Sequence, residues 1–178
     1  MNRAMLIILI AIAALIGGLF VSASQARQTN AQKQFRQLLL NDSSVDPAVK
    51  LLLQNGGFVE PDILFDDFTG EGKIDAIVSV NSSAISGTVA VYALTAGSGK
   101  TLKVVFRDES GYMVSARMEA NQKSGSTLIT DDPVFSPGDR ACCSARVFRR
   151  TWSWDAKKNQ FKLLSSKRVR VRYTAQTS

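Results

Sequence analysis

The sequence predicts an α+β fold, with N-terminal helices packed on an antiparallel β-sheet meander of about six or seven strands. Apolar residues recur with helical spacing before residue 57, whereas short β runs follow one another about every ten residues from residue 63 onward. The segments between these runs have the length of hairpin turns, too short for the crossover helix that a parallel sheet needs. The chain has 178 residues, of which 45% are hydrophobic, which suits one globular domain.

Residues 1–26 have the pattern of a targeting segment. Arg3 provides a short positive start, residues 5–21 form an apolar run, and residues 21–23 and 24–26 match the small-x-small cleavage pattern. The run is long for a signal peptide and slightly short for a spanning helix, so a cleaved signal peptide and a retained N-terminal membrane anchor are both open. Either one predicts an exported protein. A cleaved signal peptide would leave it periplasmic or secreted, whereas a retained segment would anchor it in the membrane.

Residues 27–57 form the predicted helical segment. Residues 28–40 place apolar side chains at i, i+3 and i+4, the spacing of one helix face. A second, shorter helix has clear boundary signals: Asp46 can cap it, Pro47 suits its first turn, and residues 55–57 (Asn-Gly-Gly) stop it.

The rest of the chain, residues 58–174, is predicted to form the sheet and to make one globular unit with the helical segment. Six runs carry the β pattern and are separated by stretches rich in turn-forming residues. They are residues 74–80, 87–94, 101–107, 112–119, 145–154 and 161–173. In the last two runs polar and apolar residues alternate, so that Phe148, Trp152 and Trp154 share one face.

Residues 66–75 (DDFTGEGKID), here called the acidic loop, match part of the calcium-loop pattern. Calcium loops place oxygen ligands at alternate positions and bend sharply at a glycine. The matching positions are Asp67, Thr69, Glu71, Lys73 through its carbonyl, and Asp75. The ligand chemistry departs from the pattern, because Thr69 replaces a carboxylate or amide and no bidentate Glu follows. Calcium is the one cofactor that the sequence suggests, and the alternative is a tight turn with solvated polar side chains.

The composition excludes several kinds of enzyme. The chain contains no histidine, which removes Ser-His-Asp and Cys-His nucleophile systems as well as imidazole metal ligands. Residues 97–101 (GSGKT) imitate the end of a phosphate-binding loop, but Leu94 stands where the first glycine belongs and a β run follows instead of a helix. We therefore expect a non-enzymatic protein that binds no nucleotide.

Cys142 and Cys143 are the two cysteines of the chain, and they are adjacent. Neighbouring Cα atoms lie about 3.8 Å apart, whereas an ordinary disulfide needs about 5.5 Å, so a bond between them would be strained. Three alternatives remain open: a buried small apolar pair in a turn, a redox-responsive thiol pair, or bridges to another chain.

Basic residues dominate the C-terminal part of the chain. From Cys142 to Ser178 there are ten Lys or Arg residues and one acidic residue, Asp155. The residues predicted to meet an anionic surface are Arg149, Arg150, Arg168, Arg170 and Arg172. Such a stripe suits an anionic envelope polymer, lipid headgroups or a partner protein, and the export signal argues against nucleic acid. The alternative is a solvated face whose charges block edge-to-edge aggregation.

Several stretches taken together resemble a known group of proteins. Residues 67–76 follow the pattern Asp-x-Thr-Gly-Glu-Gly-x-x-Asp-Ala, residues 131–134 read Asp-Asp-Pro-Val, residues 139–144 contain the Cys-Cys pair, and residues 149–154 read Arg-Arg-Thr-Trp-Ser-Trp. This combination resembles bacterial envelope proteins that include the LppP/LprE-type lipoproteins of mycobacteria, over residues 57–165. The chain departs from them in lacking a lipobox cysteine. The resemblance implies an exported domain with no assigned activity.

Two functional hypotheses follow. The first is an exported envelope protein, a non-enzymatic binding or structural module with a basic C-terminal face. The second is a calcium-stabilised or thiol-responsive module that uses the acidic loop or the pair Cys142 and Cys143.

Overall fold

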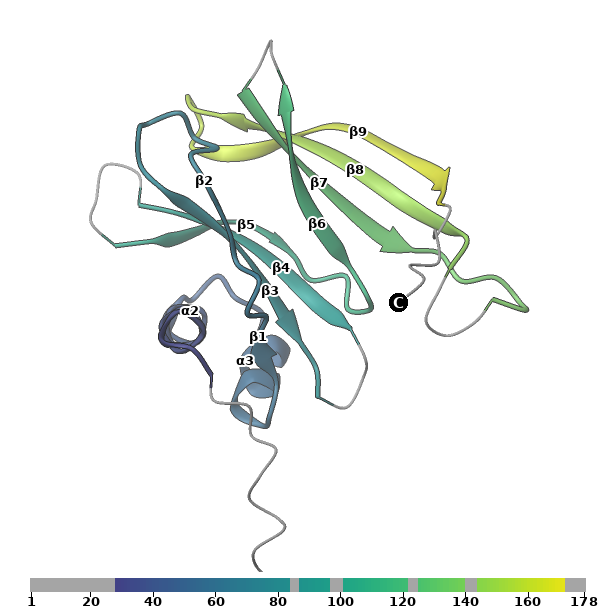
Figure 1. Cartoon of the computed structure of the whole chain (residues 1–178), viewed down its shortest axis with the longest axis horizontal. Helices are drawn as coiled ribbons and strands as arrows, with labels where there is room; N and C mark the ends of the chain where they lie inside the picture. The colour runs from purple at the N-terminus through teal and green to yellow at the C-terminus, as the bar shows by residue number, and fades with distance from the viewer. Residues whose placement is uncertain (1–27, 84–86, 97–100, 122–124, 140–143, 172–178) are drawn as a thin grey trace, which may run out of the picture.

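The structure is a computed structural model that describes residues 28–83, 87–96, 101–121, 125–139 and 144–171. Within these residues the chain forms two helices and nine strands. The elements make three layers: the helices, a five-stranded sheet and a four-stranded sheet (Figure 1). The fold is therefore α+β, as the sequence predicts.

Both helices begin at the capping residues that their sequences supply. α2 (Asn30–Asn41) follows a capping box, in which the Thr29 hydroxyl accepts a hydrogen bond from the Gln32 amide and the Gln32 side chain accepts one from the Thr29 amide. α3 (Pro47–Gln54) starts at Asp46, whose carboxylate accepts a hydrogen bond from an amide of the first turn. The two predicted helices are confirmed.

The first sheet is antiparallel, with the strand order β1-β3-β4-β5 and with β2 also paired to β3. Its strands are β1 (Phe58–Val59), β2 (Leu64–Asp66), β3 (Asp75–Asn81), β4 (Thr88–Thr95) and β5 (Lys103–Asp108). Val78, Val80 and Tyr92 pack against the helices, whereas Ile77 and Val91 pack against the second sheet. Because β3 and β4 are covered on both faces, their sequences are almost continuously apolar.

The second sheet is also antiparallel, with the strand order β6-β7-β8-β9. Its strands are β6 (Ser115–Asn121), β7 (Gly125–Pro133), β8 (Arg146–Asp155) and β9 (Gln160–Arg170). The sequence prediction contains β6, β8 and β9 but lacks β7, which occupies an interior position between β6 and β8. It also lacks the short strands β1 and β2.

Two sheets replace the single meander of six or seven strands that the sequence predicts. The chain leaves the first sheet after β5 and crosses over residues 109–114, where Gly111 and Met113 have positive φ angles of 95° and 53°. This turn carries β6 into another layer, so β6 pairs with β7 and not with β5. Within each sheet most strands that are consecutive in the chain are also neighbours, so the predicted antiparallel pairing of successive strands is confirmed in part.

Aromatic side chains fill the space between the two sheets. Phe106 of the first sheet lies edge-on to Trp152 and Phe161 of the second, with ring centroids 5.1 and 5.5 Å apart. Phe68, from the acidic loop, contacts Trp154 and Phe161 with centroid distances of 6.4 and 5.3 Å. The sheets therefore share an apolar core that is distinct from the core beneath the helices.

Residues 1–26 lie outside the described residues, so their role as a signal peptide or a membrane anchor remains a prediction. In the part of the chain that the structure describes, no helix has both the length and the apolar character that a bilayer crossing requires.

The aromatic core leads to a first prediction. Replacing Phe106 by Ala is expected to lower the free energy of unfolding by about 3–5 kcal/mol, because the buried ring leaves a cavity between the sheets. Urea unfolding of the full chain measures the change. Leu51→Ala serves as the control, since the Leu51 side chain is mostly exposed and its loss should be nearly neutral. Similar losses for the two variants would contradict a shared inter-sheet core.

Candidate functional site

The acidic loop is closed by hydrogen bonds to two carboxylates. Asp67 accepts bonds from the Glu71 and Gly72 amides at 3.0 and 2.8 Å. Asp75 accepts bonds from the Thr69 amide and hydroxyl at 3.0 and 2.9 Å. Both loop glycines have positive φ angles, which L-residues rarely adopt. The loop is therefore a tight turn that its own side chains stabilise.

The predicted calcium ligands are used differently in this turn. Asp67 and Asp75 bond to loop atoms, whereas the side chains of Glu71 and Lys73 are exposed. Among the described residues, no group of three or more acidic side chains is placed to hold one metal ion. One oxygen of Asp75, Oδ1, is buried without a hydrogen-bond partner. This geometry favours the turn, and calcium binding stays a prediction from the sequence.

Three predicted site residues, Cys142, Cys143 and Arg172, lie outside the residues that the structure describes. The thiol hypothesis therefore stays a prediction from the sequence. The other four predicted arginines are described, two of them on β8 and two on β9.

Arg149 belongs to an ion-pair network on the face of the second sheet that points away from the first. Its guanidinium holds Asp131, directly opposite on β7, with Nε–Oδ1 and Nη2–Oδ2 distances of 2.8 Å each. Arg117 of β6 donates to the same carboxylate at 3.0 Å. Burial acts to raise the pKa of Asp131, but the hydrogen bonds from Arg149 and Arg117 outweigh it and lower the pKa below its ordinary value.

Arg150 points to the opposite face and links the two sheets. Its guanidinium binds Asp132 of β7 and lies 3.3 Å from Oδ2 of Asp108, which belongs to β5 of the first sheet. Asp132 also accepts a hydrogen bond of 2.7 Å from the Ser110 hydroxyl. Burial, helped by the charge of Asp108, raises the pKa of Asp132 against the effects of Ser110 and Arg150. Arg150 therefore acts as a clamp between two acidic residues on different sheets.

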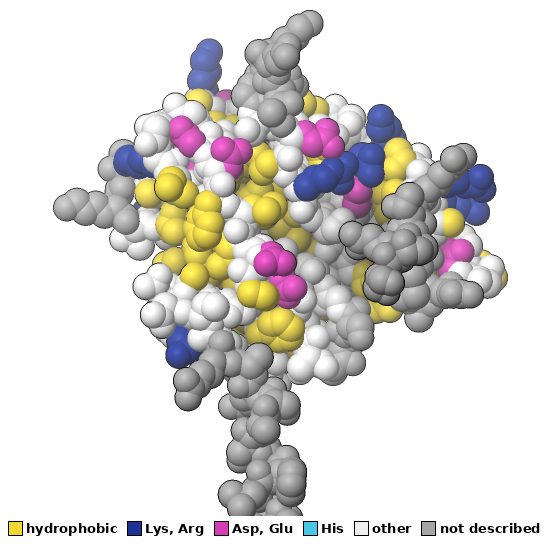
Figure 2. Space-filling model, viewed as in Figure 1, with side chains coloured by type: hydrophobic (Ala, Val, Ile, Leu, Met, Phe, Trp, Pro, Cys, Tyr) yellow, Lys and Arg dark blue, Asp and Glu magenta, His cyan; other side chains and the backbone are white. Residues whose placement is uncertain are grey.

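The arginines at the end of the β8–β9 hairpin lack such acidic partners. Arg168 lies over the ring of Phe148, with Cζ 5.0 Å from the ring centroid. Arg170 lies directly opposite Arg146, and both side chains are exposed. Among the described residues, no ion pair joins any of these three arginines to an acidic side chain. We call Arg146, Arg168 and Arg170 the arginine cluster; much of the basic surface visible in Figure 2 lies over the second sheet, to which they belong.

The predicted arginine stripe is thus divided into two sets. Arg149 and Arg150 point to opposite faces and are neutralised by acidic residues, whereas Arg168 and Arg170 are free of acidic partners among the described residues. The cluster adds Arg146, which the sequence prediction does not single out. The register of the β8–β9 hairpin would have identified Arg146, because antiparallel pairing determines which residue of β8 lies opposite Arg170.

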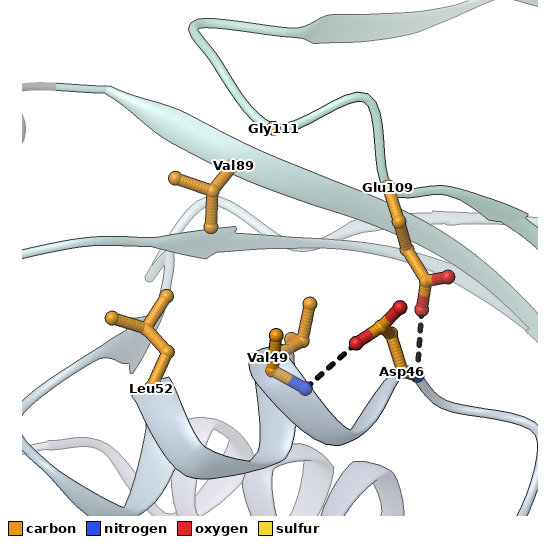
Figure 3. Close-up of a pocket in the computed structure, with 7 residues that line it drawn as sticks. Asp46, Val49, Leu52, Val89, Glu109 and Gly111 are labelled. Carbon is orange, nitrogen blue, oxygen red and sulfur yellow. Dashed lines mark hydrogen bonds between the residues drawn. The ribbon is translucent and has the colours of Figure 1, made fainter.

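A depression of about 210 Å³ lies between α3 and the first sheet (Figure 3). Val49 and Val89 line it, and Asp46 and Glu109 lie at one side. The Glu109 carboxylate accepts hydrogen bonds from the Asp46 amide at 2.9 Å and from the Tyr92 hydroxyl at 2.6 Å. These bonds fix the start of α3 on the sheet, so we assign these polar groups to packing and not to ligand binding.

The acidic loop leads to a prediction that separates the turn from the calcium site. Asp67→Ala is expected to lower the free energy of unfolding by about 0.5–1.5 kcal/mol in the presence of a chelator, because two loop amides lose their acceptor. Glu71→Ala is the control and should be nearly neutral. Urea unfolding measures both, and adding millimolar calcium should leave the wild-type midpoint unchanged. A midpoint that rises with calcium, and does so only when Asp67 is present, would establish the calcium loop instead.

The Asp131 network predicts a pH dependence of stability. Because its pKa is lowered in the folded state, Asp131 stabilises the fold at every pH above the ordinary carboxyl range near about 4, and this contribution is lost as the pH falls through the folded pKa. Asp131→Asn should therefore cost about 1–3 kcal/mol at neutral pH and less in acid. Urea unfolding at several pH values measures the difference, with Asp62→Asn as an exposed control outside the network. A cost that does not vary with pH would contradict the network.

The acidic loop, the two ion-pair systems and the arginine cluster are the polar features from which a function has to be inferred. The resemblance to envelope lipoproteins stays a prediction that depends on the stretches quoted above. Comparison of the chain with models of protein families, with curated proteins and with solved structures found no match.

Proposed function

We propose that this chain is an exported, non-enzymatic module that binds an anionic component of the cell envelope through the exposed end of β8 and β9. The observation that carries the proposal is the position of Arg146 directly opposite Arg170. Like charges at opposite positions of an antiparallel pair destabilise a sheet, whereas an anion bound between them relieves the repulsion.

The charge balance supports the proposal. The chain has a formal net charge of +7. Asp131 and Asp132 of the adjacent strand β7 are already bound by Arg149 and Arg150. The positive potential at the end of the hairpin is therefore not cancelled by its neighbours on β7, and it attracts anions from solution.

The layer order supports an envelope polymer as the ligand. α2, which follows the N-terminal apolar segment in the chain, packs on the first sheet, whereas β9 belongs to the second sheet, so the two lie in opposite outer layers (Figure 1). If the N-terminal segment holds the protein at a membrane, the hairpin end lies on the far side of the domain from that attachment. A polymer beyond the membrane surface fits this arrangement better than the membrane itself.

The proposal predicts binding that depends on salt. The full chain should co-sediment with isolated cell-wall material at low ionic strength and should be released as salt rises above about 150 mM, where charges more than about 8 Å apart are screened. An uncharged polysaccharide is the control and should retain little protein. Retention that is equally strong at all salt concentrations, or equal retention on the uncharged polymer, would contradict electrostatic binding.

A further inference from the structure

The arginine cluster has a defined geometry at the end of the β8–β9 hairpin. Arg146 and Arg170 are directly opposite, and such residues of an antiparallel pair have Cβ atoms about 4.5–5.5 Å apart. Arg168 precedes Arg170 by two positions, so it lies on the same face about 7 Å further along β9. The three side chains therefore lie on one face of two neighbouring strands.

This face is the one that looks toward the first sheet. Arg146, Phe148 and Arg150 occupy every second position of β8 and so share one face, and Arg150 reaches Asp108 of the first sheet. In Figure 1 the ends of β8 and β9 extend beyond the first sheet, so this part of the face is not covered by it. The exposure of Arg146, Arg168 and Arg170 agrees with this position.

The cluster is partly pre-organised for binding. Arg168 is held over the ring of Phe148, which is itself 39% exposed. A cation over an aromatic ring is attracted by the ring and loses some of its rotational freedom before a ligand arrives. Its planar fork keeps donors for a phosphate or carboxylate group.

Protection of a sheet edge does not explain the whole cluster. Cations on β9 could serve that purpose, because β9 is the edge strand of the second sheet. Arg146 lies on β8, an interior strand, where a cation blocks no edge and repels Arg170 across the ladder. The neighbouring acid Asp132 on β7 is bound to Arg150 and does not neutralise the cluster.

We infer that Arg146, Arg168 and Arg170 are the binding centre of the proposed function and that their ligand is an extended polymer carrying phosphate groups. The inference deepens the proposed function and rests on it. The three side chains are exposed, so each ionic contact is weak, and a ligand has to present several charges at once to bind well. A linear polymer that lies along β9 meets the paired cations and then Arg168 about 7 Å further on, whereas a single phosphate meets them only in part.

The test measures the affinity of the full chain for long-chain inorganic polyphosphate by titration calorimetry, with orthophosphate and phosphatidylglycerol vesicles as the other probes. The cluster variant carries Arg146→Gln, Arg168→Gln and Arg170→Gln. The matched control carries Lys157→Gln, Lys158→Gln and Lys162→Gln, which removes the same charge from exposed positions near the other end of the hairpin. We expect the cluster variant to lose about 10- to 100-fold in affinity for polyphosphate and the control to lose less than about threefold.

Phe148 provides a finer readout of the same site. Phe148→Leu keeps an apolar side chain but removes the ring beneath Arg168, and it should weaken polyphosphate binding by about two- to fivefold. Phe148→Tyr keeps the ring and should bind as the wild type does. The urea midpoint of the cluster variant should not fall below that of the wild type, since the variant removes a like-charge pair; this measurement separates a loss of binding from a loss of folding.

The possible results separate the two levels of the proposal. Equal losses of affinity for polyphosphate in the two triple variants would show that the arginine cluster is not the binding centre and that the protein binds through its net charge. Tighter binding to vesicles than to polyphosphate, or binding to cell-wall material without binding to polyphosphate, would overturn the polymer assignment. A wild-type chain that binds none of these probes overturns the proposed function itself.

Discussion

The second sheet depends on two ion pairs, one on each face, that join two adjacent acidic residues of β7 to two adjacent arginines of β8. Asp131 and Asp132 follow one another on β7, and Arg149 and Arg150 follow one another on β8, so strand alternation sends one ion pair to each face. An unpaired carboxylate at this depth would cost several kcal/mol. Arg149 and Arg117 outweigh the effect of burial on the pKa of Asp131, whereas Arg150 offsets only part of it at Asp132. Through Asp108, the inner pair also ties the second sheet to the first. Together with the aromatic core beside it, this arrangement holds β7 and β8 against each other and against the first sheet.

The elements that follow local rules could be predicted from the sequence, whereas their grouping into two sheets could not. Asp46 and Pro47 mark the start of α3 by capping and by the fixed φ of proline, which need no knowledge of the rest of the chain. The apolar runs of β3 and β4 are long enough to be recognised. The gap at residues 109–114 has the length and composition of a hairpin turn, and only the strand pairing, β5 with β4 and β6 with β7, shows that it leads to another layer.

The ion pairs of the candidate site could not be predicted from the sequence for the same reason: they depend on which strands lie side by side. Asp131, Asp132 and Pro133 are poor strand formers, so β7 does not stand out, yet each acid is compensated by an arginine 18 positions later. Those arginines look like surface charges until their partners are known. Hence the sequence could predict that cations collect at the C-terminal hairpin, but not that Arg149 and Arg150 hold the fold together. Which cations are left to bind a ligand is decided by pairing across strands, which a linear pattern does not record.

Two of the stretches quoted for the resemblance, the acidic loop and the aromatic end of β8, meet in the folded chain. Phe68 of the acidic loop contacts Trp154 from the aromatic end of β8, although 86 positions separate them (154 − 68). Asp67 and Asp75 hold the loop in the shape that delivers Phe68 to this contact. These two stretches therefore contribute to the core between the sheets, which gives them a structural role.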